Sequence, residues 1–179
     1  MVALDPRIHP FRPNIAASYL KGQVESKRFV DLVSQTIRRR VAAFLVVPGP
    51  PRHASGIAFL NRVLEYVFAR VTVDPQRVVL GGFSDGATYA LSLGLANGDL
   101  FPRVAAFSPG FVIPAAVRGH ARFFISHGRS DQILPIDQCS RVIVPQLRAK
   151  GYDVTFKEFD GRHEVPPEIA ADAMRWMTS

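Results

Sequence analysis

The chain has 179 residues, of which 47% are hydrophobic and 21% charged, and its formal net charge is +7. This length and composition are typical of a single globular domain, and we find no apolar run of the roughly 20 residues that cross a bilayer. The first 14 residues hold prolines and charges where a signal peptide needs an apolar segment, and the single cysteine cannot form an internal disulfide. We therefore expect a cytoplasmic protein with no membrane partner.

The positive charge is spread along the chain. Its densest cluster is Arg38–Arg40, and no aromatic residues are interleaved with a basic stripe. A solvated basic surface explains this pattern, so we expect no nucleic-acid partner.

The first elements predicted along the chain are a weakly helical segment over 14–40 and a buried strand over 41–48, VAAFLVVP. Residues 48–56 should be a loop, because three of the four residues 48–51 are proline and leave too few backbone donors for a strand or helix. Residues 57–70 place apolar side chains on one helical face.

The second part of the chain alternates apolar strands with helices. We predict strands over 77–83, 103–110, 121–128 and 153–160, and helices over 86–98, 135–150 and 166–176. Pro145 should kink the second of these helices. Such alternation predicts an α/β fold with a mostly parallel sheet and helices on both faces, and ligands bind beyond the carboxyl ends of its strands.

One serine stands where a strand turns into a helix. The stretch Gly82-Phe83-Ser84-Asp85-Gly86 matches G-x-S-x-G, the sharp turn that exposes a nucleophilic serine. The backbone N–H of Asp85, at the start of the following helix, would point towards an oxyanion formed at that serine.

A serine hydroxyl needs a base to accept its proton. His163 follows the last predicted strand, and Asp131 follows the strand before it. The order Ser84, Asp131, His163 is the one expected on this sheet topology, with the histidine as general base and the aspartate as its orienting partner.

Each of these residues also has a structural interpretation. Asp131 suits a turn or a helix N-cap, and Asp160 is a rival acid. His53 and His127 are residue types that bind metals, but no third ligand stands at a convincing spacing, so we expect no metal. Cys139 lies in a helical pattern and fits a packed thiol better than a nucleophile.

These motifs resemble the carboxylesterase/phospholipase branch of the α/β-hydrolases, which is itself similar to the dienelactone hydrolases. The resemblance covers about residues 57–179, through RVVLGGFSDGATYALSLGLANGDLF, VAAFSPGF, FFISHGRSDQILPID and GYDVTFKEFDGRHEVPPEIAADAMRW. It implies hydrolysis of a small-molecule carboxylic ester through an acyl-enzyme, without a cofactor. It also places Ser84, Asp131 and His163 on the family's catalytic positions.

The N-terminal side departs from that family. We find no His-Gly-rich loop for the second oxyanion donor, so we expect Gly49 or its neighbours to supply it, and Phe83 to line the substrate site or pack in the core. Residues 1–40 are predicted to be an atypical helical segment beside a catalytic core over 41–179. A sheet reduced at this side would expose an apolar edge, which predicts a homodimer or larger oligomer.

Two other functions remain open from the sequence. A thioesterase or deacylase would use the same three residues. The missing oxyanion loop also fits a catalytically weak module that serves binding or assembly.

Overall fold

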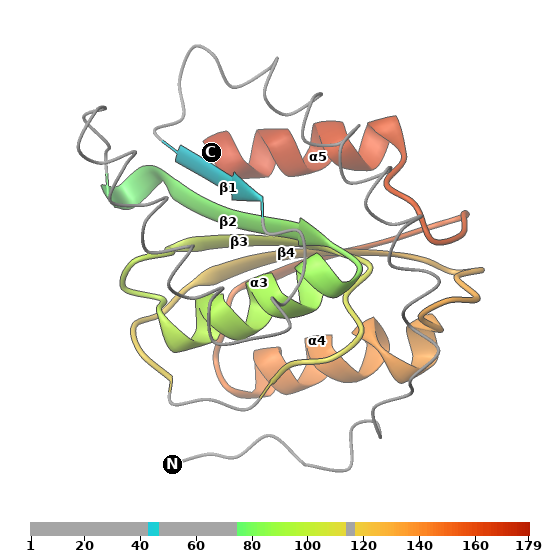
Figure 1. The fold of residues 1–179 in the computed structure, drawn as a ribbon, viewed down its shortest axis with the longest axis horizontal. Coiled ribbons are helices and arrows are strands. Elements are labelled where there is room, and N and C mark those ends of the chain that lie inside the picture. The colour runs from blue at the N-terminus through green and yellow to red at the C-terminus, as the bar shows by residue number, and fades with distance from the viewer. Residues whose placement is uncertain (1–42, 47–74, 114–116) are drawn as a thin grey trace.

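The computed structural model describes residues 43–46, 75–113 and 117–179, and these form a sheet with helices packed against it (Figure 1). The five strands follow one another in chain order, and each neighbouring pair is parallel. They are β1 (Ala43–Val46), β2 (Val78–Phe83), β3 (Arg103–Phe107), β4 (Arg122–Gly128) and β5 (Val154–Phe159). The predicted parallel α/β architecture is confirmed.

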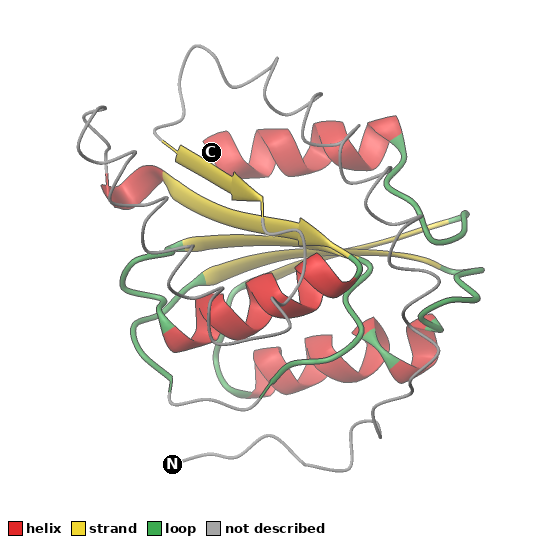
Figure 2. Cartoon of the chain, in the orientation of Figure 1, coloured by secondary structure: helices red, strands yellow, loops and turns green. Residues whose placement is uncertain are grey.

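Helices cover both faces of this sheet (Figure 2). Helices α3 (Asp85–Ala96) and α4 (Ser140–Ala149) lie on one face, and α5 (Pro167–Thr178) lies on the other. Two short 3₁₀ turns, η1 (Pro75–Arg77) and η2 (Ile136–Gln138), precede β2 and α4. The prediction of helices on both faces is also confirmed.

The strand residues divide between two cores because successive side chains point to opposite faces. Val78 and Leu80 belong to the core beneath α3 and α4, whereas Val79 between them belongs to the core beneath α5. All six residues of β2 are buried, which is why its sequence is a continuous apolar run. In β5, at the end of the strand order, Lys157 is exposed, while Val154 and Phe156 face the core beneath α3 and α4.

Two predicted elements differ from the observed ones by about three residues or more at one end. The strand predicted over 103–110 ends at Phe107, because Ser108 has φ 49°, outside the β region. The helix predicted over 135–150 begins only at Ser140, because Pro135 is extended (φ −56°, ψ 125°) and a separate 3₁₀ turn follows it. The helix then runs through Pro145 to Ala149.

Several expectations fall on residues outside the described ranges. Of the strand predicted over 41–48, the structure contains its middle part, β1. The segment 1–40, the loop 48–56 and the helix 57–70 lie outside, so the reduced N-terminal side and the boundary near residue 40 stay predictions. In the part of the chain that is described, no helix is both long enough and apolar enough to span a bilayer.

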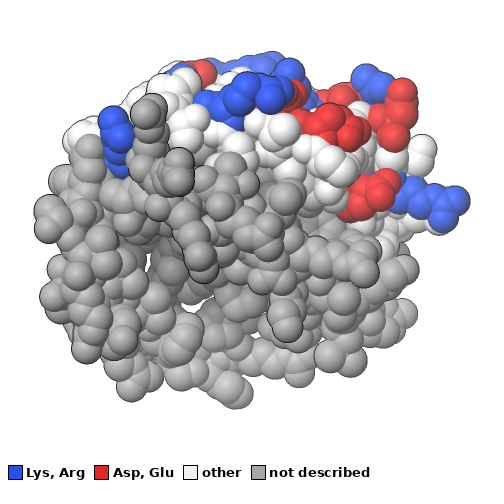
Figure 3. Space-filling model, turned by 90° about the horizontal axis from the view of Figure 1, so that it is seen from above, with Lys and Arg blue, Asp and Glu red and all other residues white. Residues whose placement is uncertain are grey.

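Charged side chains of both signs lie next to one another on the face that carries them in Figure 3. Near the ends of β4 and β5, Arg129 binds Glu158 and Asp160 at 3.2 and 2.7 Å. Arg141 of α4 binds the same Glu158 at 2.7 Å, as well as Asp137. These exposed pairs hold their side chains locally but contribute little to stability individually.

Candidate active site

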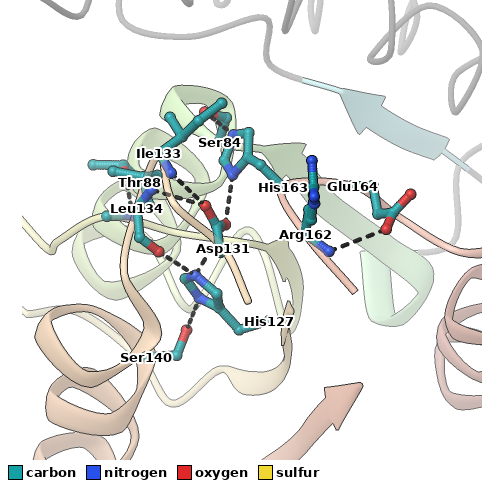
Figure 4. Close-up of polar contacts among 11 residues, drawn as sticks. Ser84, Thr88, His127, Asp131, Ile133, Leu134, Ser140, Arg162, His163 and Glu164 are labelled. Carbon is teal, nitrogen blue, oxygen red and sulfur yellow. Dashed lines mark hydrogen bonds and ion pairs between the residues drawn. The ribbon is translucent and has the colours of Figure 1, made fainter. Parts of the chain in front are cut away.

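Three polar side chains from three strand ends meet at one edge of the sheet (Figure 4). Ser84 follows β2 directly, and Asp131 and His163 follow β4 and β5. The Oγ of Ser84 lies 2.8 Å from Nε2 of His163, and Nδ1 of His163 lies 2.6 Å from Oδ2 of Asp131. Residues that are 79 and 32 positions apart in the sequence therefore form one hydrogen-bonded chain.

The backbone of Ser84 adopts a conformation that is rare for residues with a Cβ. Its dihedral angles are φ 58° and ψ −122°, a region that glycine occupies readily and other residues only at a cost in free energy. The turn is held from both sides. The Ser84 N–H donates to the carbonyl of Phe107 at 2.9 Å, and its own carbonyl accepts from Thr88 at 3.1 Å, which starts α3.

The glycines around the serine allow strand and helix to come into contact. A Cβ on Gly82 would lie 2.2 Å from the carbonyl oxygen of Gly86 and 2.7 Å from the backbone nitrogen of Ala87. Both neighbours are backbone atoms, which cannot rotate away as a side chain would. The first glycine of the predicted G-x-S-x-G turn is therefore required sterically.

Asp131 is a turn residue and also the partner of His163. Its Oδ1 accepts the backbone N–H groups of Ile133 and Leu134, each at 2.9 Å, while Oδ2 faces the histidine. Burial alone would raise the pKa of Asp131. Hydrogen bonds from His127, His163 and the Leu134 N–H outweigh that effect and lower the pKa well below its ordinary value. The carboxylate is therefore ionised at neutral pH.

That ionised carboxylate determines which nitrogen of His163 carries the proton. A carboxylate only accepts hydrogen bonds, so Nδ1 of His163 must be the donor. In the neutral ring Nε2 then carries a lone pair, which accepts a hydrogen bond from the Ser84 hydroxyl. The ring rests against Phe83, with centroids 4.7 Å apart.

Phe83 itself belongs to the core. Its side chain is 4% exposed and packs in the cluster beneath α5. Of the two interpretations given for Phe83, the structure shows core packing, and its ring also contacts the ring of His163.

The two expected oxyanion donors differ in what the structure shows of them. Asp85 is the first residue of α3, so its backbone N–H belongs to the unpaired donors at a helix N-terminus. Burial raises the pKa of its carboxyl, and the nearby His163 opposes that shift. Gly49 lies outside the described residues.

The rival residues occupy other roles. Asp160 is 89% exposed and binds Arg129, so it does not reach the site. Cys139 is buried, and that burial, together with the charge of Asp131, raises the pKa of its thiol to about 12. His127 is fully buried against Asp131. Within residues 43–46, 75–113 and 117–179, no three metal-binding side chains gather into a site.

Two hydroxyls of α3 also shape this end of the sheet, and the sequence did not single them out. Thr88 Oγ1 accepts the N–H of Gly110, and Ser92 Oγ accepts the N–H of Ile113, both at 2.9 Å. They attach the segment after β3 to the helix that carries the nucleophile's turn. Their spacing of four residues places them on one helical face, but a hydroxyl pattern in a small-residue helix is not specific enough to predict its partner.

Comparison with known proteins gives a consistent assignment. A model of the phospholipase/carboxylesterase family matches residues 54–178, which include all three side chains of the hydrogen-bonded chain. Over 104 residues the chain is 28% identical to acyl-protein thioesterase 1 of Gibberella zeae, an alignment that covers 52% of this chain and 44% of that relative. The chain thus matches less than half the length of this curated relative.

Solved structures share the fold. Esterase PE8 superposes with a TM-score of 0.61 and 25% identity, covering 69% of this chain and 59% of the esterase. The Bacillus cereus carboxylesterase gives a TM-score of 0.56 at 20% identity, over 66% and 57% of the two chains. The family match spans well over half of the sequence, and the parallel sheet agrees with it. This protein therefore belongs to the phospholipase/carboxylesterase family of α/β-hydrolases.

Proposed function

We propose that this protein hydrolyses short-chain carboxylic esters through an acyl-enzyme formed on Ser84. The observation that carries the proposal is the unbroken hydrogen-bonded chain from Ser84 Oγ through His163 to Asp131, with distances of 2.8 and 2.6 Å. The family assignment supports the same chemistry. β2 passes into α3 through Ser84 alone, with no insertion between strand and helix, which favours an open site for small esters.

In the first half of the reaction, Ser84 Oγ forms a bond to the ester carbonyl carbon. Its proton passes to Nε2 of His163, the nitrogen that the Asp131 contact leaves unprotonated. The bond between the carbonyl carbon and the alcohol oxygen then breaks, and His163 returns the proton to the leaving alkoxide. Asp131 stabilises the imidazolium between these two transfers.

In the second half, water takes the place of the alcohol. His163 accepts a proton from the water as its oxygen attacks the acyl carbon, and then protonates Ser84 Oγ as the acyl bond breaks. The free acid leaves and the serine is restored. Both halves pass through an oxyanion. In this proposal the backbone N–H of Asp85, at the α3 N-terminus, donates a hydrogen bond to it.

A second donor is expected from Gly49 or its neighbours. The loss of one oxyanion donor costs about 10²–10³ in kcat in a well-studied serine protease. A protein with the Asp85 donor alone would therefore be slow but still measurably active.

Thioester hydrolysis is a second candidate, because the aligned relative is named an acyl-protein thioesterase. The same proton transfers apply, with a thiolate instead of an alkoxide leaving. The two activities are separated by comparing kcat/KM for a matched pair of substrates, such as ethyl butyrate and ethyl thiobutyrate.

The direct test is the hydrolysis of p-nitrophenyl acetate, butyrate and octanoate by the wild type and by Ser84→Ala. We expect kcat to fall by about 10³-fold or more in the variant, because no other group takes over the nucleophile's role. Ser130→Ala is the matched control, since this serine is exposed on the loop beside Asp131 and should keep wild-type turnover.

A fluorophosphonate probe provides the second readout. It should label the wild-type protein at Ser84 in a one-to-one ratio and leave Ser84→Ala unlabelled. Equal hydrolysis by wild type and Ser84→Ala, with no labelling in either, would refute the proposal and favour the module that serves binding or assembly.

A further inference from the structure

A second histidine lies directly behind the Asp131 carboxylate, and the proposed reaction does not use it. His127, in β4, is 0% exposed, and both of its ring nitrogens are hydrogen bonded. Nδ1 lies 2.7 Å from the hydroxyl of Ser140, and Nε2 lies 2.7 Å from the carbonyl oxygen of Leu134 (Figure 4). Nε2 also lies 3.2 Å from Oδ2 of Asp131, the same oxygen that His163 binds.

These neighbours determine the proton positions on the His127 ring. A carbonyl oxygen and an ionised carboxylate both accept and never donate, so Nε2 of His127 must carry a hydrogen. The Ser140 hydroxyl can donate, and it therefore serves the unprotonated Nδ1. In this form a neutral ring satisfies every polar contact around it, as a fully buried imidazole requires.

The Nε2–H group of His127 completes the set of donors around Asp131. Oδ1 is held by the N–H groups of Ile133 and Leu134, and Oδ2 by the two histidines. Leu134 takes part twice, since its N–H binds the carboxylate while its carbonyl binds His127. The histidine thus anchors both the carboxylate and the turn that presents it.

We propose that His127 is a positioning residue: it holds the Asp131 carboxylate in the one orientation that aligns His163 with Ser84. This inference rests on the proposed hydrolase function, and it extends the chain of contacts from Ser84 inward to Ser140 at the start of α4. Without the Nε2–H donor, His163 is the one described partner left on Oδ2, and this oxygen can swing about Oδ1, which the Ile133 and Leu134 N–H groups still hold.

Two substitutions distinguish the contacts made by the two ring nitrogens of His127. In His127→Gln, the amide nitrogen lies as many bonds from Cα as Nε2 does, so a donor to Asp131 and Leu134 is retained. In His127→Asn, the amide group reaches only as far as Nδ1, so contact with Ser140 is retained and the donor to Asp131 is lost. His120→Asn is the matched control, because this histidine is exposed and stacks on Tyr152 away from the site.

We expect His127→Asn to lower kcat for p-nitrophenyl butyrate by about 10- to 100-fold, with KM changed by less than about threefold, since a small misplacement of catalytic groups costs this much. The rate of Ser84 labelling by the fluorophosphonate should fall by a similar factor. His127→Gln should recover most of both rates, and His120→Asn should match the wild type. Rates are expressed per folded molecule, with the folded fraction taken from thermal unfolding.

A purely structural histidine would give a different result. Both His127 variants would then unfold at similarly reduced temperatures and show wild-type kcat and labelling rate per folded molecule, and the proposal would be wrong. Loss of activity to the same extent in both variants would also contradict it, because the retained donor would have no effect.

Nitrogen NMR of the wild-type histidines tests the inference without any variant and without turnover. The proposal requires His127 as the Nε2–H tautomer, and finding its proton on Nδ1 would overturn it, because Nε2 could no longer donate to Asp131. Failure of the proposed function gives another pattern, in which the wild type shows no Ser84-dependent hydrolysis. In that case no Ser84 labelling is expected either, and the tautomer of His127 alone still decides whether its Nε2 can donate to Asp131.

Discussion

The conformation of Ser84 predicts that glycine at this position makes the protein more stable than alanine does. With φ 58° and ψ −122°, the residue lies where a Cβ is unfavourable. Both Ser84→Gly and Ser84→Ala remove the hydroxyl and its 2.8 Å contact with His163, so that loss cancels between them. The two variants differ only in the Cβ, which alanine keeps and glycine lacks.

The magnitude follows from two opposing terms. Relief of backbone strain at such a residue is about 1–3 kcal/mol in favour of glycine. The greater freedom of glycine in the unfolded chain opposes this by about 0.4–1 kcal/mol. With the middle of each range, Ser84→Gly should be more stable than Ser84→Ala by about 1–1.5 kcal/mol, which for a chain of this size raises Tm by roughly 2–6 °C.

Ser92 provides the control, because it lies inside α3 with ordinary helical geometry and is also buried and hydrogen bonded. There the order should reverse: Ser92→Gly should be less stable than Ser92→Ala by about 1 kcal/mol, the difference in helix propensity.

Tm of all four variants is measured by calorimetry or circular dichroism, and urea unfolding gives the free energies. If Ser84→Gly proves no more stable than Ser84→Ala, while the Ser92 pair shows the expected order, then Ser84 is not strained and the argument is refuted. Both Ser84 variants should lack hydrolytic activity whatever their stability.

Three further outcomes are expected. Asp131→Asn should lower kcat by about 10³–10⁴-fold, because an amide no longer fixes the proton on Nδ1 of the histidine, whereas Asp160→Asn, on an exposed side chain, should leave kcat near the wild-type value. The thiol of Cys139 is buried and its pKa is raised to about 12. It should therefore resist iodoacetamide in the native protein and react only after unfolding, as measured by mass spectrometry. Rapid alkylation of the native protein would contradict its burial. Gly82→Ala should destabilise the protein by about 3 kcal/mol or more and abolish activity, since its Cβ would collide with backbone atoms. Gly151 has φ +83°, but a Cβ there would meet no atom of the described residues within 4 Å, so Gly151→Ala should cost less and remain active. The free energies of unfolding compare the two variants.

Much of this fold was predictable from local pattern. The apolar runs around Val79 and Phe124 fitted buried strands, and their alternation with helical periodicity implied a parallel sheet. The glycines beside Ser84 indicated a forced turn, and the order of Ser84, Asp131 and His163 along the chain indicated which strand ends should meet. Boundaries were less predictable, because the end of β3 and the start of α4 depend on the local dihedral angles of Ser108 and Pro135.

Tertiary structure alone decided how each polar group is used. The sequence left Asp131 open as a turn residue or a catalytic partner, and the fold makes it both, since its two oxygens face different sets of donors. For His127 the sequence offers metal binding alone as a role, yet the residue lies behind that carboxylate with both nitrogens paired. The sequence determines which polar side chains the protein has and which strand ends carry them. Hydrogen-bond partners are determined by distances of about 3 Å between atoms far apart in the chain, and only packing of the strands and helices sets those distances.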